Sequence, residues 1–225
     1  MNEGIGTPVW FQIGPVAVHE TVVATWGIML VLTLVCALST RKMSIQPGKW
    51  QTIVEGIVLA LENTIANADP VNARKLLPLI GTFWIFLPIA NLLGVVPGFH
   101  SPTRDLSVTT ALALIVFVSV HLYGLRQSGM AYFRHYIKPS PILLPFHIIS
   151  EFTRTIALAI RLFGNIMSLE MAALLILLVA GFLAPVPILM LHIIEALVQA
   201  YIFGMLALIY VAGAMQQVPA SSSQT

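Results

Sequence analysis

The chain has 225 residues, of which 58% are hydrophobic and 9% charged, whereas about a quarter of the residues in an ordinary soluble domain are charged. This composition argues against a soluble globular protein and indicates an integral membrane protein. The net charge of +2 is small and dispersed, which argues against nucleic acid as a partner. The single cysteine, Cys36, excludes an intrachain disulfide and a cysteine-based metal centre.

The N-terminal segment, residues 1–19, contains no Lys or Arg. It therefore lacks the cationic start of a cleavable secretory signal, and we expect it to form a short external tail. Residues 21–38 are free of charge. At about 1.5 Å per residue they nearly cross a hydrocarbon core of about 30 Å, which predicts the first membrane span.

Residues 51–68 show the pattern of an amphipathic helix. Two glutamates, Glu55 and Glu62, fall on one stripe, and a second stripe is apolar, formed by Val54, Ile57, Val58, Leu61 and Ile65. We predict a helix that lies at the membrane interface. A further full span is the competing interpretation, which the glutamates and two asparagines disfavour.

Apolar runs predict further membrane spans at 76–96 and 106–125. The run 147–183 is longer than a bilayer is thick, so it must tilt strongly. Two prolines, Pro185 and Pro187, interrupt this run before a last helix at 188–212 and a polar cytoplasmic tail at 216–225.

These segments predict a single integral membrane domain over residues 1–225. Its fold class is an all-α polytopic membrane protein with about five membrane-crossing helices and one interfacial amphipathic helix. The last two membrane helices form a long tilted helical hairpin.

Basic residues in short loops predict the orientation, because such residues favour the cytoplasmic side. The loop between 96 and 106 contains one, Arg104. The loops that would lie on the opposite side contain Arg41, Lys42, Lys49, Arg74, Lys75, Arg126, Arg134 and Lys138. We therefore expect the N-terminus outside the cytoplasm and the C-terminus in it.

Arg161 lies in the middle of an apolar run, where a charge costs about 2.5 to 3.5 kcal/mol on insertion scales. An acid three or four residues away would neutralise it, but those positions are occupied by Ala157, Leu158, Gly164 and Asn165. Arginine stays protonated even when buried, so it acts as a fixed positive charge and not as an ion carrier. A snorkelling or structural arginine is the alternative interpretation.

Helical spacing places polar side chains on two faces of this run. Asn165 and Ser168 share the stripe of Arg161, with Arg154 one heptad earlier. Glu170 is rotated by about 180° from Arg161 and lies about 13 Å farther along the axis. The two faces are thus suited to contact different aqueous compartments.

A second polar stripe, formed by His192, Glu195 and Gln199, lies on the last helix at i, i+3 and i+7. Across the proline turn, Glu170, His192 and Glu195 are placed to converge in a hydrated cluster that passes protons, since histidine titrates near neutral pH. A hydrogen-bond network that pairs the helices is an equally open interpretation.

Motifs for cofactors are missing from the sequence. It contains no HExxH segment and no GxxxxGK[ST] phosphate loop. We therefore expect no metal site, no cofactor and no site for ATP in this chain.

Four segments are distinctive together: AIRLFGNIMSLE and LHIIEALVQAYIF, with NLLGVVPG and PTRDLS earlier in the chain. In these segments, over about residues 76–212, the chain resembles subunit a of the membrane sector of the F-type ATP synthase. It implies a stator that forms two offset half-channels for protons or sodium ions with a ring of c subunits. The implied partners are this ring, the peripheral-stalk b subunits, the rest of the complex and the lipid bilayer, and the expected membrane is a bacterial cell inner membrane.

The resemblance also implies roles for individual residues. Arg161 is the essential arginine that faces the ring carboxylates, Gln199 lies near it, and Asn165 lines the same interface. The remaining residues belong to the half-channel open to the outside, with Glu170, His192 and Glu195 along it and Asn91 and Asp105 at the channel entrance. One departure is Arg104, which stands where the family has a small residue and is placed to pair with Asp105.

Other protein classes also place charges inside a membrane. A self-contained secondary transporter predicts inverted repeats and broken helices, and the sequence shows neither. An intramembrane hydrolase that uses His192 and Glu195 requires a nucleophile or metal set at reactive spacing, which is missing. A structural assembly subunit without an ion path is the remaining alternative.

Overall fold

The computed structural model describes residues 9–13, 16–41, 48–96, 99–129, 144–181, 184 and 186–216. Five of its helices are long and apolar enough to cross a membrane. They are α1 (Glu20–Thr40), α3 (Ala73–Leu92), α4 (Leu106–Ser128), α6 (Leu144–Ala180) and α7 (Val186–Gln216). The predicted class of an all-α polytopic membrane protein is confirmed.

The remaining elements are short or amphipathic. Helix α2 (Lys49–Ala68) covers the predicted amphipathic segment. Two single-turn 3₁₀ helices, η1 (Leu93–Val95) and η2 (Pro102–Arg104), lie in the connection between α3 and α4. Of the polar C-terminal tail, only Gln216 lies within the described residues, and it ends α7.

The N-terminal segment contains a β-hairpin that the sequence analysis did not anticipate. Strands β1 (Val9–Ile13) and β2 (Val16–His19) pair antiparallel, with Val9 opposite His19 and Ile13 opposite Val16. Helix α1 begins at the residue after β2. The hairpin therefore leads directly into the first apolar helix.

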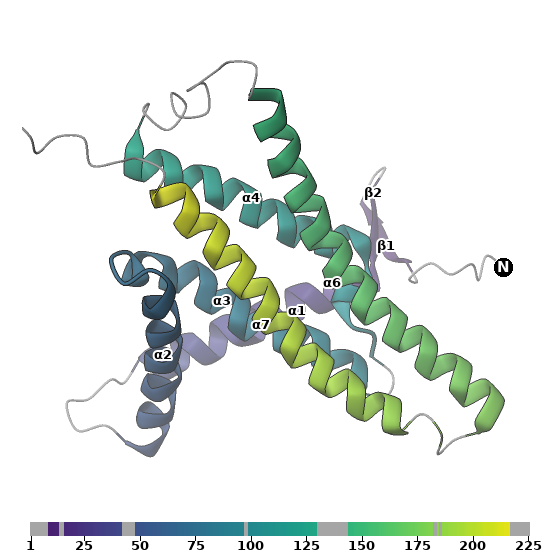
Figure 1. The fold of residues 1–225 in the computed structure, drawn as a ribbon. Helices are drawn as coiled ribbons and strands as arrows, with labels where there is room; N and C mark the ends of the chain where they lie inside the picture. The colour runs from purple at the N-terminus through teal and green to yellow at the C-terminus, as the bar shows by residue number, and fades with distance from the viewer. Residues whose placement is uncertain are drawn as a thin grey trace, which may run out of the picture.

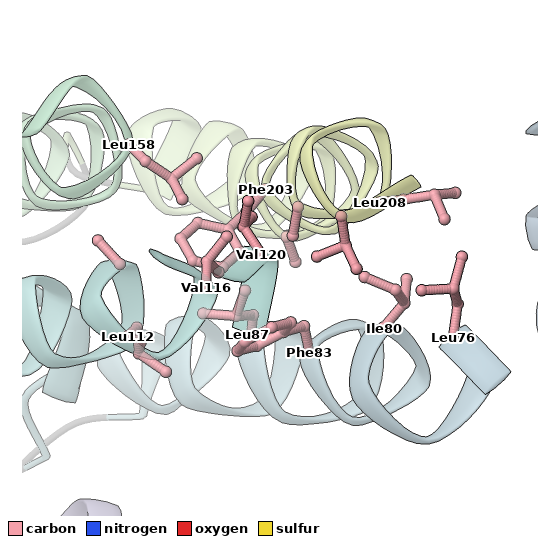
Figure 2. Close-up of a cluster of buried hydrophobic side chains, with 14 of the residues drawn as sticks. Leu76, Ile80, Phe83, Leu87, Leu112, Val116, Val120, Leu158, Phe203 and Leu208 are labelled. Carbon is pink, nitrogen blue, oxygen red and sulfur yellow. The ribbon is translucent and has the colours of Figure 1, made fainter. Parts of the chain in front are cut away.

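The core lies between α3, α4, α6 and α7 (Figure 2). Leu76, Ile80, Phe83 and Leu87 of α3 recur at helical spacing and are buried, which gives α3 one apolar face for this core. Phe83 meets Phe203 of α7 edge to face, with ring centroids 5.4 Å apart. Figure 2 shows Leu112, Val116 and Val120 of α4, Leu158 of α6 and Leu208 of α7 around this pair.

Helices α6 and α7 form the long hairpin predicted from the sequence. In Figure 1 the end of α6 and the start of α7 lie at the same end of the molecule, and the two helices run in opposite directions from there. Half of the apolar window of α7 is buried, against 11% of that of α6. Helix α7 thus lies inside the bundle, whereas α6 presents a wide apolar face to its surroundings.

Candidate functional site

Arg161 lies on the exposed face of α6. The same helix turns Leu158, Leu162, Ile166 and Leu169 toward the other helices, at helical spacing, and all four are buried. This packing fixes the rotation of α6 and leaves Arg161 on the outer side. Within the described part of the chain, Arg161 makes no hydrogen bond or ion pair. The three acidic side chains that form ion pairs there, Glu62, Glu151 and Glu170, bind other arginines.

Asn165, one turn after Arg161, connects α6 to α7. Its Nδ2 donates a hydrogen bond of 2.8 Å to Oε1 of Gln199. Gln199 is 2% exposed, and its own Nε2 is buried without a hydrogen-bond partner among the described residues. The two predicted site residues are therefore brought together beside the arginine, with one amide donor still unsatisfied.

Glu170 is bound from the connection between α3 and α4. Arg104 Nη1 lies 3.2 Å from Glu170 Oε2, and the backbone N–H of Ser101 donates to Oε1 at 3.3 Å. Arg104 thus pairs with Glu170 and not with its neighbour Asp105, a pairing that the sequence had left open. The reason is geometric, because the backbone turns at η2 and sends the two adjacent side chains to different helices.

Asp105 caps α4 and binds α1. Its Oδ1 accepts from the backbone N–H of Ser107 at 2.9 Å, and its Oδ2 accepts from Thr21 Oγ1 at 2.8 Å. Burial alone would raise the pKa of Asp105, but the hydrogen bonds from Ser107 and Thr21 and the nearby His19 together lower it below its usual value. Asp105 therefore acts in this structure as a charged N-cap at the N-terminal end of α4.

Asn91 is fully buried at the junction of α3, α7 and η2. Its Nδ2 donates to the carbonyl of Ala196 at 3.2 Å, and its Oδ1 accepts from Thr103 Oγ1 at 2.7 Å. The Thr103 hydroxyl lies 2.6 Å from that of Ser101, whose backbone N–H binds Glu170. A continuous chain of hydrogen bonds therefore leads from α7 through Asn91 to Glu170.

His192 and Glu195 lie on α7 in different environments. His192 is 1% exposed, and its Nε2 has no hydrogen-bond partner among the described residues, whereas Glu195 is half-buried. Across the described ranges, no hydrogen bond or ion pair joins Glu170, His192 and Glu195, and no three metal-binding side chains gather as a site. Their convergence in a hydrated cluster stays a prediction.

A further polar cluster near the N-terminal half of α6 was not predicted. Arg154 lies 3.4 Å from Glu151 and 4.5 Å above the ring centre of Tyr210 on α7. These side chains line a cavity of about 250 Å³. The signal in the sequence was the i, i+3 spacing of Glu151 and Arg154, since such a pair meets on one helix face.

Comparisons with known proteins give one consistent family. Residues 22–212 match the family model described as ATP synthase A chain. The chain is 79% identical over 217 residues to ATP synthase subunit a 1 of Hahella chejuensis, covering 96% of this chain and 93% of that protein. It is 56% identical to ATP synthase subunit a 2 of Pelobacter propionicus, covering 96% of each chain.

A third relative, ATP synthase subunit a of Legionella pneumophila, is 52% identical over 217 residues, which cover 96% of this chain and 94% of that protein. The family model and the relatives extend over nearly all of the chain, from the first membrane helix to the last. With five apolar helices in the structure, they confirm the predicted resemblance. The chain therefore belongs to the ATP synthase A chain family and is an integral membrane subunit of the stator of the F-type ATP synthase.

Proposed function

We propose that this chain forms two offset ion half-channels with a ring of c subunits and couples the flow of protons or sodium ions to rotation of that ring. Arg161 is the essential residue in this proposal. The observation that carries it is the position of Arg161, exposed on an apolar helix without an anionic partner in the described part of its own chain.

The acidic residues nearest to Arg161 along α6, Glu151 and Glu170, do not form an ion pair with it. Glu170 is engaged by Arg104 and Ser101. Glu151 is paired with Arg154. A permanent cation on a membrane helix requires an anion, and a carboxylate that another subunit carries past it satisfies this requirement. Opposite Arg161 such a carboxylate ionises and releases its ion, because a nearby cation favours the charged form.

The same charge also separates the two half-channels. A cation that moved directly from one half-channel to the other would pass the guanidinium and be repelled. Ions therefore cross the membrane only on the rotating ring. Each elementary charge that crosses releases about 2.3 kcal/mol of free energy per 100 mV of membrane potential. The hydrogen bond between Asn165 and Gln199 supports this role, because it fixes α6 against α7 beside the arginine.

The half-channel open to the outside contains Glu170, His192 and Glu195, with Asn91 and Asp105 at its entrance. Two observations support this assignment. His192 is a buried titratable group whose Nε2 has no partner among the described residues. The hydrogen-bonded chain through Asn91 also places polar groups continuously beside Glu170.

The proposed orientation puts the N-terminus outside and the C-terminus in the cytoplasm of a bacterial cell, in its inner membrane. It rests on the basic residues of the loops on one side. In this orientation α2 lies at the cytoplasmic interface, with its two glutamates toward water. The peripheral-stalk b subunits are the proposed partners that hold the chain against the torque of the ring.

The test is Arg161→Ala in the complete complex, reconstituted into liposomes. We expect loss of ion-driven ATP synthesis with an unchanged amount of assembled complex. Arg74→Ala is the matched control, since Arg74 is an exposed arginine of α3 whose side chain is 90% exposed. Normal synthesis by the Arg161→Ala complex would refute the proposal.

A further inference from the structure

The ion pair between Arg104 and Glu170 joins the loop between α3 and α4 to α6, 66 residues later in the chain. We propose that Arg104 is a positioning residue, the internal counter-ion that holds the Glu170 carboxylate in place in the outer half-channel. This inference rests on the proposed function, in which Glu170 belongs to that half-channel. According to this inference, Arg104 affects the pH range over which the half-channel conducts ions.

Both oxygens of Glu170 are engaged by the same loop. Oε2 lies 3.2 Å from Arg104 Nη1, and Oε1 accepts from the backbone N–H of Ser101 at 3.3 Å. The side chains of Arg104 and Glu170 are 18% and 11% exposed. The pair is thus largely withdrawn from water, where a charge interaction is stronger than at a protein surface.

The loop backbone closes on the carboxylate from a second side. A Cβ atom at Gly94 would lie 2.8 Å from Glu170 Oε1 and 3.0 Å from Ser101 Cβ. Only a glycine leaves room for Glu170 at this position without displacing its neighbours. The arginine, the backbone donor and the glycine together define one position for the carboxylate.

The other charged groups near this loop point elsewhere. Asp105 binds Ser107 and Thr21. On α7, His192 is buried, and within the described chain neither it nor the half-buried Glu195 forms an ion pair with Glu170. Arg161 lies on the opposite face of α6. Arg104 is therefore the cation that the described structure gives to Glu170.

A cation beside a carboxylate favours its charged form, and its removal favours the protonated form. A proton or sodium ion that enters the half-channel must compete with Arg104 for Glu170. The carboxylate then exchanges its internal counter-ion for the transported one and returns to Arg104 when that ion has passed on. Neutralising Arg104 removes this competition and one of the two contacts that hold the Glu170 carboxylate in place.

The experiment measures ATP-driven ion transport by the complete complex in liposomes as a function of pH on the outer side. For Arg104→Gln we expect the acidic limb of the profile to move to higher pH by about one unit. In the double variant Arg104→Gln/Glu170→Gln, we expect the profile of Glu170→Gln alone. The matched control is Arg74→Gln, which removes an arginine from an exposed ion pair with Glu62 and leaves the profile unchanged.

If Arg104→Gln lowers the amount of assembled complex, the variant Arg104→Lys, which keeps a positive charge, is compared with the unchanged complex instead. We then expect assembly and a profile close to that of the unchanged complex. A fully assembled Arg104→Gln complex with an unchanged profile would overturn the inference, as would an assembled Arg104→Lys complex with the profile fully shifted. Loss of transport in a parallel Arg161→Ala complex shows that the proposed function holds whatever Arg104 does.

Discussion

Asn165 Nδ2 on α6 lies 2.8 Å from Gln199 Oε1 on α7, and this hydrogen bond joins the two long helices one turn from Arg161. Gln199 is almost fully buried, so its oxygen has no access to bulk water. The bond therefore fixes the rotation of α6 relative to α7. The direction in which Arg161 points depends on that rotation.

We predict that Gln199→Leu lowers ion-driven ATP synthesis about tenfold, which corresponds to about 1.4 kcal/mol, within the usual range for the net contribution of one hydrogen bond. The measurement is the rate of synthesis in liposomes, normalised to assembled complex. Asn63→Leu serves as the control because Asn63 is an exposed amide on α2. Equal rates for Gln199→Leu and the unchanged complex would show that this bond does not position the arginine.

We predict that His192→Ala and Glu170→Gln slow ion flow without uncoupling it from ATP synthesis. Both side chains belong to the proposed outer half-channel, whereas the proposed function assigns the separation of the half-channels to Arg161. The measurement is the ratio of ATP made to ions transported, together with the absolute flux. A normal ion flux in either variant would show that the residue is not part of the pathway. A reduced ratio of ATP made to ions transported would show that the residue takes part in coupling.

We predict that Asp105 stabilises the junction of α1 and α4 only above acidic pH. Its pKa in the folded chain is below the usual 3.8, so its stabilising effect is present above that value and is lost as the pH falls through the folded pKa. Asp105→Ala should cost about 0.5 to 2 kcal/mol at neutral pH through loss of the helix cap. Thermal denaturation of the detergent-solubilised complex at a series of pH values from about 7 downward should show this difference shrink once the pH falls below 3.8, and a constant difference throughout would contradict the assignment.

We predict that Gly204→Ala destabilises the packing of α3 on α7 by about 1 to 3 kcal/mol. A Cβ atom at Gly204 would overlap the indole ring of Trp84, whose Nε1 donates to the carbonyl of Tyr201 at 3.2 Å. Gly213→Ala on the same helix is the control, because a Cβ there meets nothing within 4 Å. Thermal denaturation should separate the two variants, and equal midpoints would contradict the predicted overlap.

The membrane helices were predictable because long apolar runs without charge have few other stable structures in a bilayer. The helix at 51–68 was predictable from its two stripes. The hairpin from Val9 to His19 was not predicted, although the Gly-Pro dipeptide at 14–15 between its two short strands is a turn signal in the sequence. The cap formed by Asp105 was readable in principle, because an aspartate followed two residues later by Ser107 before an apolar run is a common helix start.

The partner of Glu170 was not predictable from local spacing. Arg104 is separated from it by 66 residues and adjoins Asp105, so proximity in the sequence favoured the wrong acid. Asn91 shows the same limit, since its burial and its two hydrogen bonds depend on how α3, α7 and η2 meet. Helical periodicity predicts which residues of one helix share a face. It does not predict which helix a distant loop will contact.

The exposed guanidinium on α6 has a consequence for a newly inserted copy of the chain. In the proposed assembly a neighbouring subunit covers that turn of the helix. In a copy without that neighbour, the charge lies against hydrocarbon and draws water or lipid headgroups toward it, which thins the bilayer locally. On this proposal, an orphan copy differs from an assembled one in the lipid that surrounds it.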